Sequence, residues 1–386
     1  MMKKKIFSVV VLWVCVFFMI ASTSALAAKP KQVSITAYGV GSQAYIFSAG
    51  IAEAVKKVAG IKTNVIPAGT DVGRVLPMRN GEVEFTIVTG ATGWFVSHGT
   101  GDFGGPEWGP QPIRMAWRGG NLFVGIYTRG DSGIKTIADM KGKRAAVVPG
   151  SATCTNNVLG PLAFGGLYLD KGDFRAIQFP SHGAAAKAVT EGAADIYQFG
   201  TTGSAPMETA ASLHGIHWFD LDIKNEKGWE RLWAFSPWAA KALVTRYAGK
   251  EKGHPPFHAM VYPYNIWCWD NTPIDTVYEY AKAMWDGYDI YKNVHAELPG
   301  WNHETLADTT GCFYPYHAGV VKLMKEKGVW TKKHEQFQQT QLNNEKKRMA
   351  LWKVAQSEAK AKKIALDSPE WGKFWWNKLA AEGLLK

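Results

Sequence analysis

Short apolar stretches alternate with amphipathic segments along most of this chain. The first apolar stretches of strand length are residues 33–37, 63–67 and 85–88. Between the first two, Phe47, Ile51 and Val55 recur at the spacing that places side chains on one face of a helix. Because parallel strands are joined by crossover helices, this order predicts a parallel sheet covered on both faces. A ligand site is then expected at the carboxyl ends of the strands.

The same order is repeated after a pair of long apolar segments. Residues 113–117 and 122–128 predict strands at which the chain crosses between two lobes, and residues 260–269 predict the return strand. Between them lie further strand-length stretches at 144–148, 175–179 and 194–199. We therefore expect an α/β fold of two lobes with hinge strands. The expected division is 29–120 and 262–330 for lobe I and 121–261 for lobe II.

Residues 331–386 have a purely helical, amphipathic pattern and predict a C-terminal helical extension. Its aromatic residues include Trp352, Trp371, Phe374, Trp375 and Trp376. We interpret them as a seam between packed helices in preference to a contact with a membrane surface.

The N-terminus has the three parts of a secretory signal peptide. Lysines at positions 3–5 precede an apolar run at 6–20, and Ala25-Leu26-Ala27 is a small-residue cleavage site, so we expect cleavage near Ala27 or Ala28. A membrane anchor is the less favoured alternative, because the run is shorter than the roughly 18 residues that a spanning helix needs.

Charge and cysteine content narrow the classes of function. The formal net charge is +11, and much of it lies in lysines of the last sixty or so residues. That distribution indicates a solvated basic helix face and no nucleic-acid footprint. Beyond the signal peptide the cysteines are Cys154, Cys268 and Cys312. An odd count permits at most one disulfide, and Cys268–Cys312 is the pairing we favour.

The strongest candidate for a binding site follows the strand at 144–148. Pro149-Gly150 ends this strand, and a helix then begins whose first turn contains Ser151, Thr153 and Thr155. The first amides of a helix have no partner within the helix, and the helix dipole is positive there. We therefore expect Ser151, Ala152, Thr153 and Thr155 to hold a small carboxylate between the lobes.

Facing contacts are expected from the ends of other strands. The candidates are Gly41, Ser42 and Tyr45 after the first strand, Thr89, Gly90 and Thr92 after the third, and Phe199, Gly200 and Thr201 in lobe II. Arg118 lies near the predicted crossing. Its guanidinium either binds the ligand carboxylate through two nitrogens or forms part of a hinge salt bridge, and the sequence favours neither. Trp94, Trp117 and Trp267 are candidates for an aromatic floor, although a place in the core is favoured for each.

Three catalytic interpretations compete with binding. Gly39, Gly41 and Ala44 fit the dinucleotide fingerprint, with Asp71 as the ribose ligand, so an exported Rossmann-type oxidoreductase is the alternative function. Gly130-Asp131-Ser132-Gly133 resembles a protease nucleophile loop, and His98 and Asp102 precede it in the chain order of such a triad. The motif lies, however, in an α/β pattern and not in a β-barrel. Cys154 in a helix first turn would have a stabilised thiolate. A packing role is favoured for it, because no histidine is near in sequence.

Several motifs, in their order and spacing over roughly residues 33–328, are similar to those of a known family. The motifs are residues 39–45, 80–88, 100–103, 131–135, 139–143, 149–153, 191–195 and 316–320. In these the chain resembles the TAXI-type periplasmic solute receptors of tripartite ATP-independent (TRAP) transporters. The high tryptophan content, the Gly/Pro-rich loop around Trp108 and the extension after Trp330 depart from the family pattern.

The resemblance implies a type II periplasmic-binding-protein-like fold whose lobes close over a small organic anion. It also implies a periplasmic location and, as partner, the membrane subunits of an importer. On this interpretation the protein is no enzyme, needs no cofactor or metal and functions as a monomer.

Overall fold

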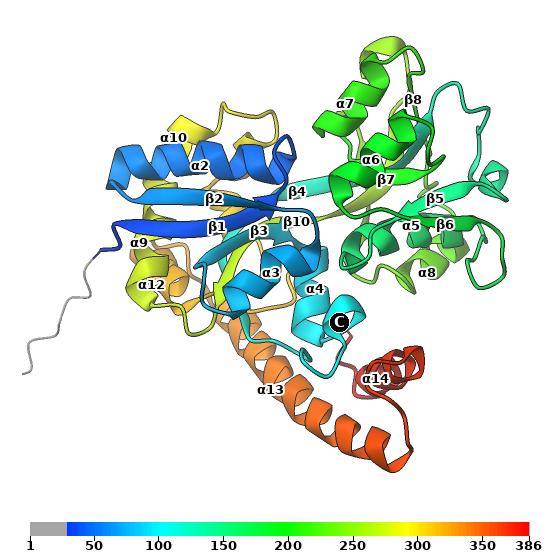
Figure 1. The fold of residues 1–386 in the computed structure, drawn as a ribbon. Coiled ribbons are helices and arrows are strands. Elements are labelled where there is room, and N and C mark those ends of the chain that lie inside the picture. Colours follow the sequence, from blue (N-terminus) through cyan, green and yellow to red (C-terminus); the bar gives the residue numbers. More distant parts are fainter. Residues whose placement is uncertain (1–28, 386) are drawn as a thin grey trace, which may run out of the picture.

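The computed structural model describes residues 29–385, so the predicted signal peptide lies outside the described residues. One sheet of eight strands runs through the molecule in the order β2-β1-β3-β10-β4-β7, with β8 added to β4 and β9 to β10 (Figure 1). Its strands are β1 Gln32–Tyr38, β2 Lys62–Ala68, β3 Phe85–Thr89, β4 Ile113–Arg129, β7 Tyr197–Gly200, β8 Ile216–Trp218, β9 Ala240–Val244 and β10 Phe257–Trp269. A second, parallel pair consists of β5 Arg144–Val147 and β6 Arg175–Gln178.

The two lobes share the long strands β4 and β10. Strands β1, β2 and β3 are parallel, as predicted, whereas β10 is antiparallel to both β3 and β4. Figure 1 shows β4 and β10 passing from the group of elements around β1 to the group around β7. This is the two-lobed arrangement of type II periplasmic binding proteins, so the predicted fold class is confirmed. We adopt the lobe boundaries proposed from the sequence.

Helices cover the sheet on both faces. In lobe I they are α2 Gln43–Ala59, α3 Asp71–Arg79, α4 Gly90–His98, α9 Ile274–Asp286, α10 Tyr288–Tyr291, α11 His303–Leu306 and α12 Ala318–Glu326. In lobe II they are α5 Ala152–Phe164, α6 His182–Thr190, α7 Ser204–Ala211 and α8 Glu226–Trp233. Short 3-10 turns occupy η1 Gly101–Phe103, η2 Ile137–Met140, η3 Lys250–Lys252 and η4 Leu298–Gly300. Hydroxyl side chains of Ser42, Thr70 and Thr89 cap α2, α3 and α4, each of which follows a strand.

Strand β4 differs from the prediction of two separate strands. The polar and glycine residues at 118–121 suggest a break in the sequence, but the backbone continues as one strand from Ile113 to Arg129. At Gly119 a Cβ atom would lie 2.4 Å from the Trp301 ring. Glycine is required there because the indole packs directly on the strand. The strand continues because β10 pairs with it on both sides of this segment, at Arg118 and from Asn121 onward.

The C-terminal extension consists of α13 Lys332–Ala361 and α14 Pro369–Ala381. In Figure 1, α13 (orange) runs away from lobe I, and α14 (red) brings the C-terminus back beside α4. Trp352, Trp371 and Trp375 form the centre of a separate small core. The Trp375 indole also donates to the His98 carbonyl over 2.9 Å, so the aromatic residues join the extension to lobe I. No helix within residues 29–385 is long and apolar enough to cross a membrane.

The predicted disulfide is wrong. Cys154, Cys268 and Cys312 are all free and buried. The Cys268 Sγ atom faces the Arg114 carbonyl at 3.9 Å, whereas the Cys312 Sγ atom faces the Met115 sulfur at 3.8 Å. The two thiols thus contact different groups of β4, a backbone carbonyl and a methionine sulfur.

Candidate functional site

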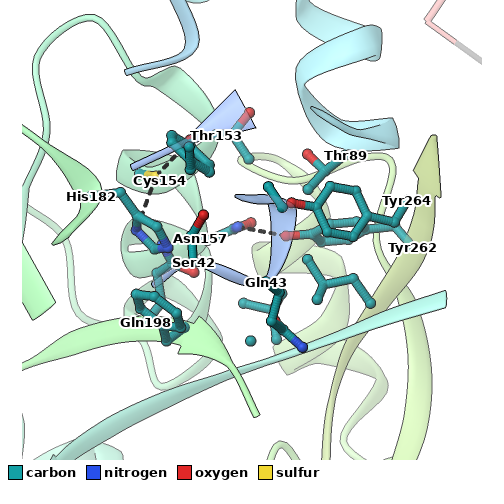
Figure 2. A pocket seen from close by; sticks show the side chains of 16 residues that line it. Ser42, Gln43, Thr89, Thr153, Cys154, Asn157, His182, Gln198, Tyr262 and Tyr264 are labelled. Atoms are coloured by element: carbon teal, nitrogen blue, oxygen red, sulfur yellow. Dashed lines mark hydrogen bonds between the residues drawn. The ribbon is translucent and has the colours of Figure 1, made fainter. Parts of the chain in front are cut away.

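A small closed cavity lies between the lobes, at the carboxyl ends of β1 and β3 and beside the start of α5 (Figure 2). We call it the interlobe cavity. Its volume is about 40 Å³. It is lined by Tyr38, Ser42, Gln43, Ala44, Thr89, Leu122, Val124, Thr153, Cys154, Asn157, His182, Gln198, Phe199, Gly200, Tyr262 and Tyr264. A space of this size holds a few water molecules, so a larger guest requires the lobes to separate.

The lining of the interlobe cavity combines polar side chains with apolar surface and includes no charged residue. Side-chain amides come from Gln43, Asn157 and Gln198, and phenols come from Tyr262 and Tyr264 (Figure 2). The Asn157 amide donates to the Tyr262 hydroxyl over 2.7 Å. The Asn157 carbonyl oxygen is buried without a hydrogen-bond partner, and an unsatisfied acceptor of this kind is available to a donor on a ligand.

The amides at the start of α5, which the sequence marks as the anion site, already hold carboxylates of the protein itself. The Ala152 N–H donates to Asp102 over 2.5 Å, and the Thr153 N–H donates to Asp71 over 3.2 Å. Both carboxylates belong to lobe I, whereas α5 belongs to lobe II. The positive end of the helix therefore binds lobe I in this conformation.

Asp71 is the centre of a buried polar network. It is 0% exposed and forms a 2.5 Å ion pair with Arg74, which is also 0% exposed. The same carboxylate accepts hydrogen bonds from the Tyr38 hydroxyl over 2.9 Å and from the Thr92 hydroxyl over 3.1 Å. The Arg74 guanidinium lies 3.5 Å from the centre of the Tyr38 ring. Because a buried charge is tolerated only with such partners, the network holds these side chains in one arrangement.

Further direct contacts hold the lobes together. Hydroxyl pairs join Tyr38 to Ser151 at 3.1 Å and Thr92 to Thr153 at 3.0 Å. On the other side of the cavity, the Gln43 amide donates to the Thr202 hydroxyl over 2.9 Å. Backbone bonds from Val72 to Gly150 and from His182 to Gly69 also cross between the lobes. The structure is therefore a closed form, stabilised by contacts within the chain.

The Asp102 carboxyl is a weaker acid than an ordinary aspartate. Burial raises its pKa from 3.8 to about 6, and the neighbouring negative charge of Asp71 adds to the rise. The hydrogen bond from Ala152 opposes the shift without cancelling it. Closing the lobes therefore favours the protonated form of Asp102.

The structure separates the predicted site residues into groups. Ser42, Thr89, Thr153, Phe199 and Gly200 line the interlobe cavity. Gly41 lines a neighbouring cavity of about 240 Å³ between the 39–42 turn and helices α6 and α7, which we call the mouth cavity. Tyr45, Gly90, Thr92, Arg118, Ser151, Ala152, Thr155 and Thr201 are in neither lining.

Arg118 does not line the interlobe cavity, where it would have bound a ligand carboxylate. Its guanidinium donates to Asp308 over 2.8 Å and to the Gly119 carbonyl over 2.7 Å. Of the two alternatives in the sequence, the salt bridge near the hinge is the one formed. Thr155 and Thr201 are similarly occupied, because their hydroxyls donate to the Val148 and Arg246 carbonyls.

The predicted site residues included none of the amides and phenols in the lining, and not its histidine. The missed residues are Tyr38, Gln43, Asn157, His182, Gln198, Tyr262 and Tyr264. Tyr38 and Gln43 flank the Gly-rich turn and could have been included on that ground. The others come from the middle of α5, from α6, and from strands β7 and β10, whose approach depends on the closed arrangement of the lobes.

Cys154 does have a histidine beside it, contrary to the expectation from the sequence. Its Sγ atom lies 3.5 Å from Nδ1 of His182, which in turn lies 2.8 Å from the Tyr197 hydroxyl. Burial raises the pKa of the Cys154 thiol to about 11, and the Asp71 charge adds to this. Burial also lowers the pKa of His182 to about 3, with the Arg74 charge acting in the same direction. The pair is therefore a neutral thiol and a neutral imidazole, which agrees with the packing role favoured for Cys154 and not with a stabilised thiolate.

We expect Cys154 to be inert in the native protein for this reason. Iodoacetamide at pH 8 should modify it about a hundredfold more slowly in native buffer than in denaturant, because almost none of the thiol is ionised. Peptide mass spectrometry of the labelled protein measures both rates at this residue. Fast native labelling of Cys154 would contradict the neutral pair.

The residues expected for the enzyme alternatives are engaged elsewhere. The Asp71 carboxylate is buried against Arg74 and cannot reach a ribose on the surface of a cofactor site. Asp102 holds the start of α5, and the Ser132 hydroxyl donates to Thr128 over 3.2 Å, so the protease-like motif has no assembled triad. Across residues 29–385, no group of three or more His, Cys, Asp or Glu side chains is placed to hold a metal ion.

Comparisons with known proteins give one family and several distant structures. Residues 35–328 match the model of the NMT1-like family. The periplasmic binding protein BugD has a TM-score of 0.49 at 13% identity, covering 78% of this chain and 98% of its own. An ancestral arginine-binding protein bound to arginine has a TM-score of 0.42 at 13% identity, over 69% and 97%. The alkanesulfonate-binding protein SsuA from Xanthomonas axonopodis pv. citri, bound to MOPS, has 0.40 at 15%, over 79% and 96%.

Proposed function

Because the chain belongs to the NMT1-like family, and because its two lobes close on a cavity that both of them line, we propose that it is a periplasmic solute-binding receptor. The observation that carries the proposal is the interlobe cavity, whose lining comes from both lobes and contains no assembled catalytic group. A ligand that touches both lobes stabilises the closed form, and a membrane partner can recognise that form. In this function no bond is made or broken.

For the partner we keep the assignment suggested by the sequence motifs, the membrane subunits of a TRAP transporter of the TAXI type. The order of motifs over residues 33–328 supports it. The proposed binding surface combines the predicted Ser42, Thr89, Thr153, Phe199 and Gly200 with the amides and phenols of the interlobe cavity.

Two ligand classes fit different states of this site. A small organic acid, the class expected from the sequence, would bind the α5 amides in an open form, after Asp102 and Asp71 have left them. An uncharged solute with amide or hydroxyl groups would match the interlobe lining once the lobes have moved apart enough to hold it, because that lining includes the unpartnered Asn157 carbonyl and no charged side chain. The lining favours the uncharged solute, because a third carboxylate near Asp71 and Asp102 would be repelled.

A screen of matched acid and amide pairs tests the function and the ligand class together. The mature protein is incubated with pairs such as succinate and succinamide, or glutamate and glutamine, and its unfolding temperature is measured. A true ligand at about 100 times its Kd should stabilise the fold by about 2.7 kcal/mol. Mass spectrometry of whatever co-purifies widens the screen to compounds outside the panel.

The outcomes of the screen separate the alternatives. Stabilisation by an amide but not by its acid supports the uncharged class, and the reverse supports displacement of Asp102. Asn157→Ala should abolish binding of the amide. Conversion of a bound compound into a product would contradict the receptor function, and co-purified nicotinamide cofactor would support the oxidoreductase instead.

A further inference from the structure

A second cavity, separate from the interlobe site, lies where the C-terminal extension meets both lobes. We call it the seam cavity. Its volume is about 450 Å³, within the range of small-molecule sites. Its walls come from α14, from the loop at 99–105 that follows α4, and from Asn156 on α5. In Figure 1, α14 and the C-terminus lie beside α4. The seam cavity shares no lining residue with the interlobe cavity.

Aromatic rings form much of the wall of the seam cavity. They belong to Phe95, Trp371, Trp375 and Trp376. The indole N–H groups of Trp371 and Trp375 donate to the Gly104 and His98 carbonyls over 2.7 and 2.9 Å. Both rings are buried, with Trp371 2% and Trp375 1% exposed, so they pack behind the cavity and offer a guest little surface. Trp376 is only half-buried and is the most accessible of the three indoles.

The charged lining residues of the seam cavity are both acidic. They are Asp102 and Asp367, and the lining includes no Lys, Arg or His. Thr100, another lining residue, has a buried hydroxyl without a hydrogen-bond partner. Aromatic faces attract cations through the ring quadrupole, and carboxylates beside them add direct attraction. The combination is selective for charge, because an anion would meet two carboxylates and no compensating base.

We infer that the seam cavity is a second binding site and that it takes a small organic cation of the alkylammonium class. The cation would lie against the Trp376 ring, close to Asp367 and Asp102. Asp102 also accepts the Ala152 amide at the start of α5, so a cation at this carboxylate acts directly on a contact that closes the lobes. The inference does not depend on the proposed function, because none of the seam residues lines the interlobe cavity.

Isothermal titration of the mature protein with choline, and in parallel with its uncharged isostere 3,3-dimethylbutan-1-ol, tests the site. The two probes have the same shape and differ in charge, so we expect choline to bind at least about tenfold more tightly. Trp376→Leu and Asp367→Asn should each weaken choline binding by about tenfold, whereas Trp376→Phe, which keeps an aromatic face, should weaken it less. Asp170→Asn, at an exposed acid of lobe II outside the seam, is the matched control and should have no effect.

Three results would overturn the inference. The first is equal binding of choline and its isostere, and the second is no binding of choline at millimolar concentration. The third is loss of choline binding in Asn157→Ala with no loss in Trp376→Leu, which would place the cation in the interlobe cavity. Circular dichroism of each variant confirms that it is folded. The choline experiment does not depend on the result of the acid and amide screen. Either proposal can therefore be contradicted while the other stands.

Discussion

Replacing Asp71 by alanine is expected to lower the free energy of unfolding by about 3–5 kcal/mol, the typical loss when one partner of a buried ion pair is removed. Arg74, which is 0% exposed, would keep its charge without the carboxylate that now lies 2.5 Å away. Tyr38, Thr92 and the Thr153 amide would lose the same acceptor. The loss therefore includes the contact between lobe I and α5 as well as the ion pair.

Urea unfolding of the wild type, Asp71→Ala, Arg74→Met and the double variant measures this effect as a double-mutant cycle. We expect the double variant to lose less than the sum of the single losses, because it leaves no unpaired charge. Asp131→Ala is the matched control. Asp131 also pairs with an arginine, at 2.8 Å from Arg129, but on the surface, so its removal should change stability little. Equal losses for Asp71→Ala and Asp131→Ala would contradict the buried network.

Asp102→Asn is expected to stabilise the protein at pH 7.5 and to remove one component of its pH dependence. Because the pKa of Asp102 is raised to about 6 in the folded chain, the folded protein binds a proton here more tightly than the unfolded chain does. The stability that this proton contributes is fully present below about pH 4 and is lost as the pH rises through 6. A shift of this size corresponds to at most about 3 kcal/mol. Asparagine keeps an oxygen for the Ala152 amide and does not ionise.

The difference between wild type and variant is the quantity to measure, because buried histidines act in the opposite direction. Burial lowers the pKa of His182 to about 3 and of His317 to about 4, so both destabilise the fold as the pH falls below about 6.5. These contributions are common to both proteins and cancel in the difference. Unfolding curves at pH 5 and 7.5 should show a larger advantage of Asp102→Asn at the higher pH, because at pH 5 the wild type has regained about half of the proton's contribution. The same advantage at both values would contradict the raised pKa.

The local elements of this chain could be predicted well from the sequence because their causes are local. The period of the apolar positions predicts α2, and the Ser42 hydroxyl caps its first turn. The beginning of α5 follows from Pro149-Gly150, which ends the preceding strand. The two-lobed order of strands follows from the repeated alternation. The break expected in β4 was wrong because β10, far along the chain, pairs with the strand on both sides of Gly119.

The candidate site was predicted only in part. The sequence correctly marks the start of α5 as an attractive place for a carboxylate, and the structure has carboxylates there. These carboxylates belong to Asp71 and Asp102, which the sequence suggested for a ribose contact and a protease motif. The amides of Asn157 and Gln198 gave no signal, because such side chains are common on exposed surfaces and reach a cavity only when the lobes close.

By itself, then, the sequence determined the fold class, the succession of helices and strands, and the positive potential at the first turn of α5. These depend on neighbours within a few residues and on the pattern of apolar positions. Only the tertiary structure decided which groups that potential attracts, which residues line the interlobe cavity and which charged side chains are buried. Those outcomes depend on residues such as Asp71 and Thr153, which are distant along the chain and 3.2 Å apart in the closed fold. The free energy of such a pair depends on burial and geometry, and neither is set by local sequence.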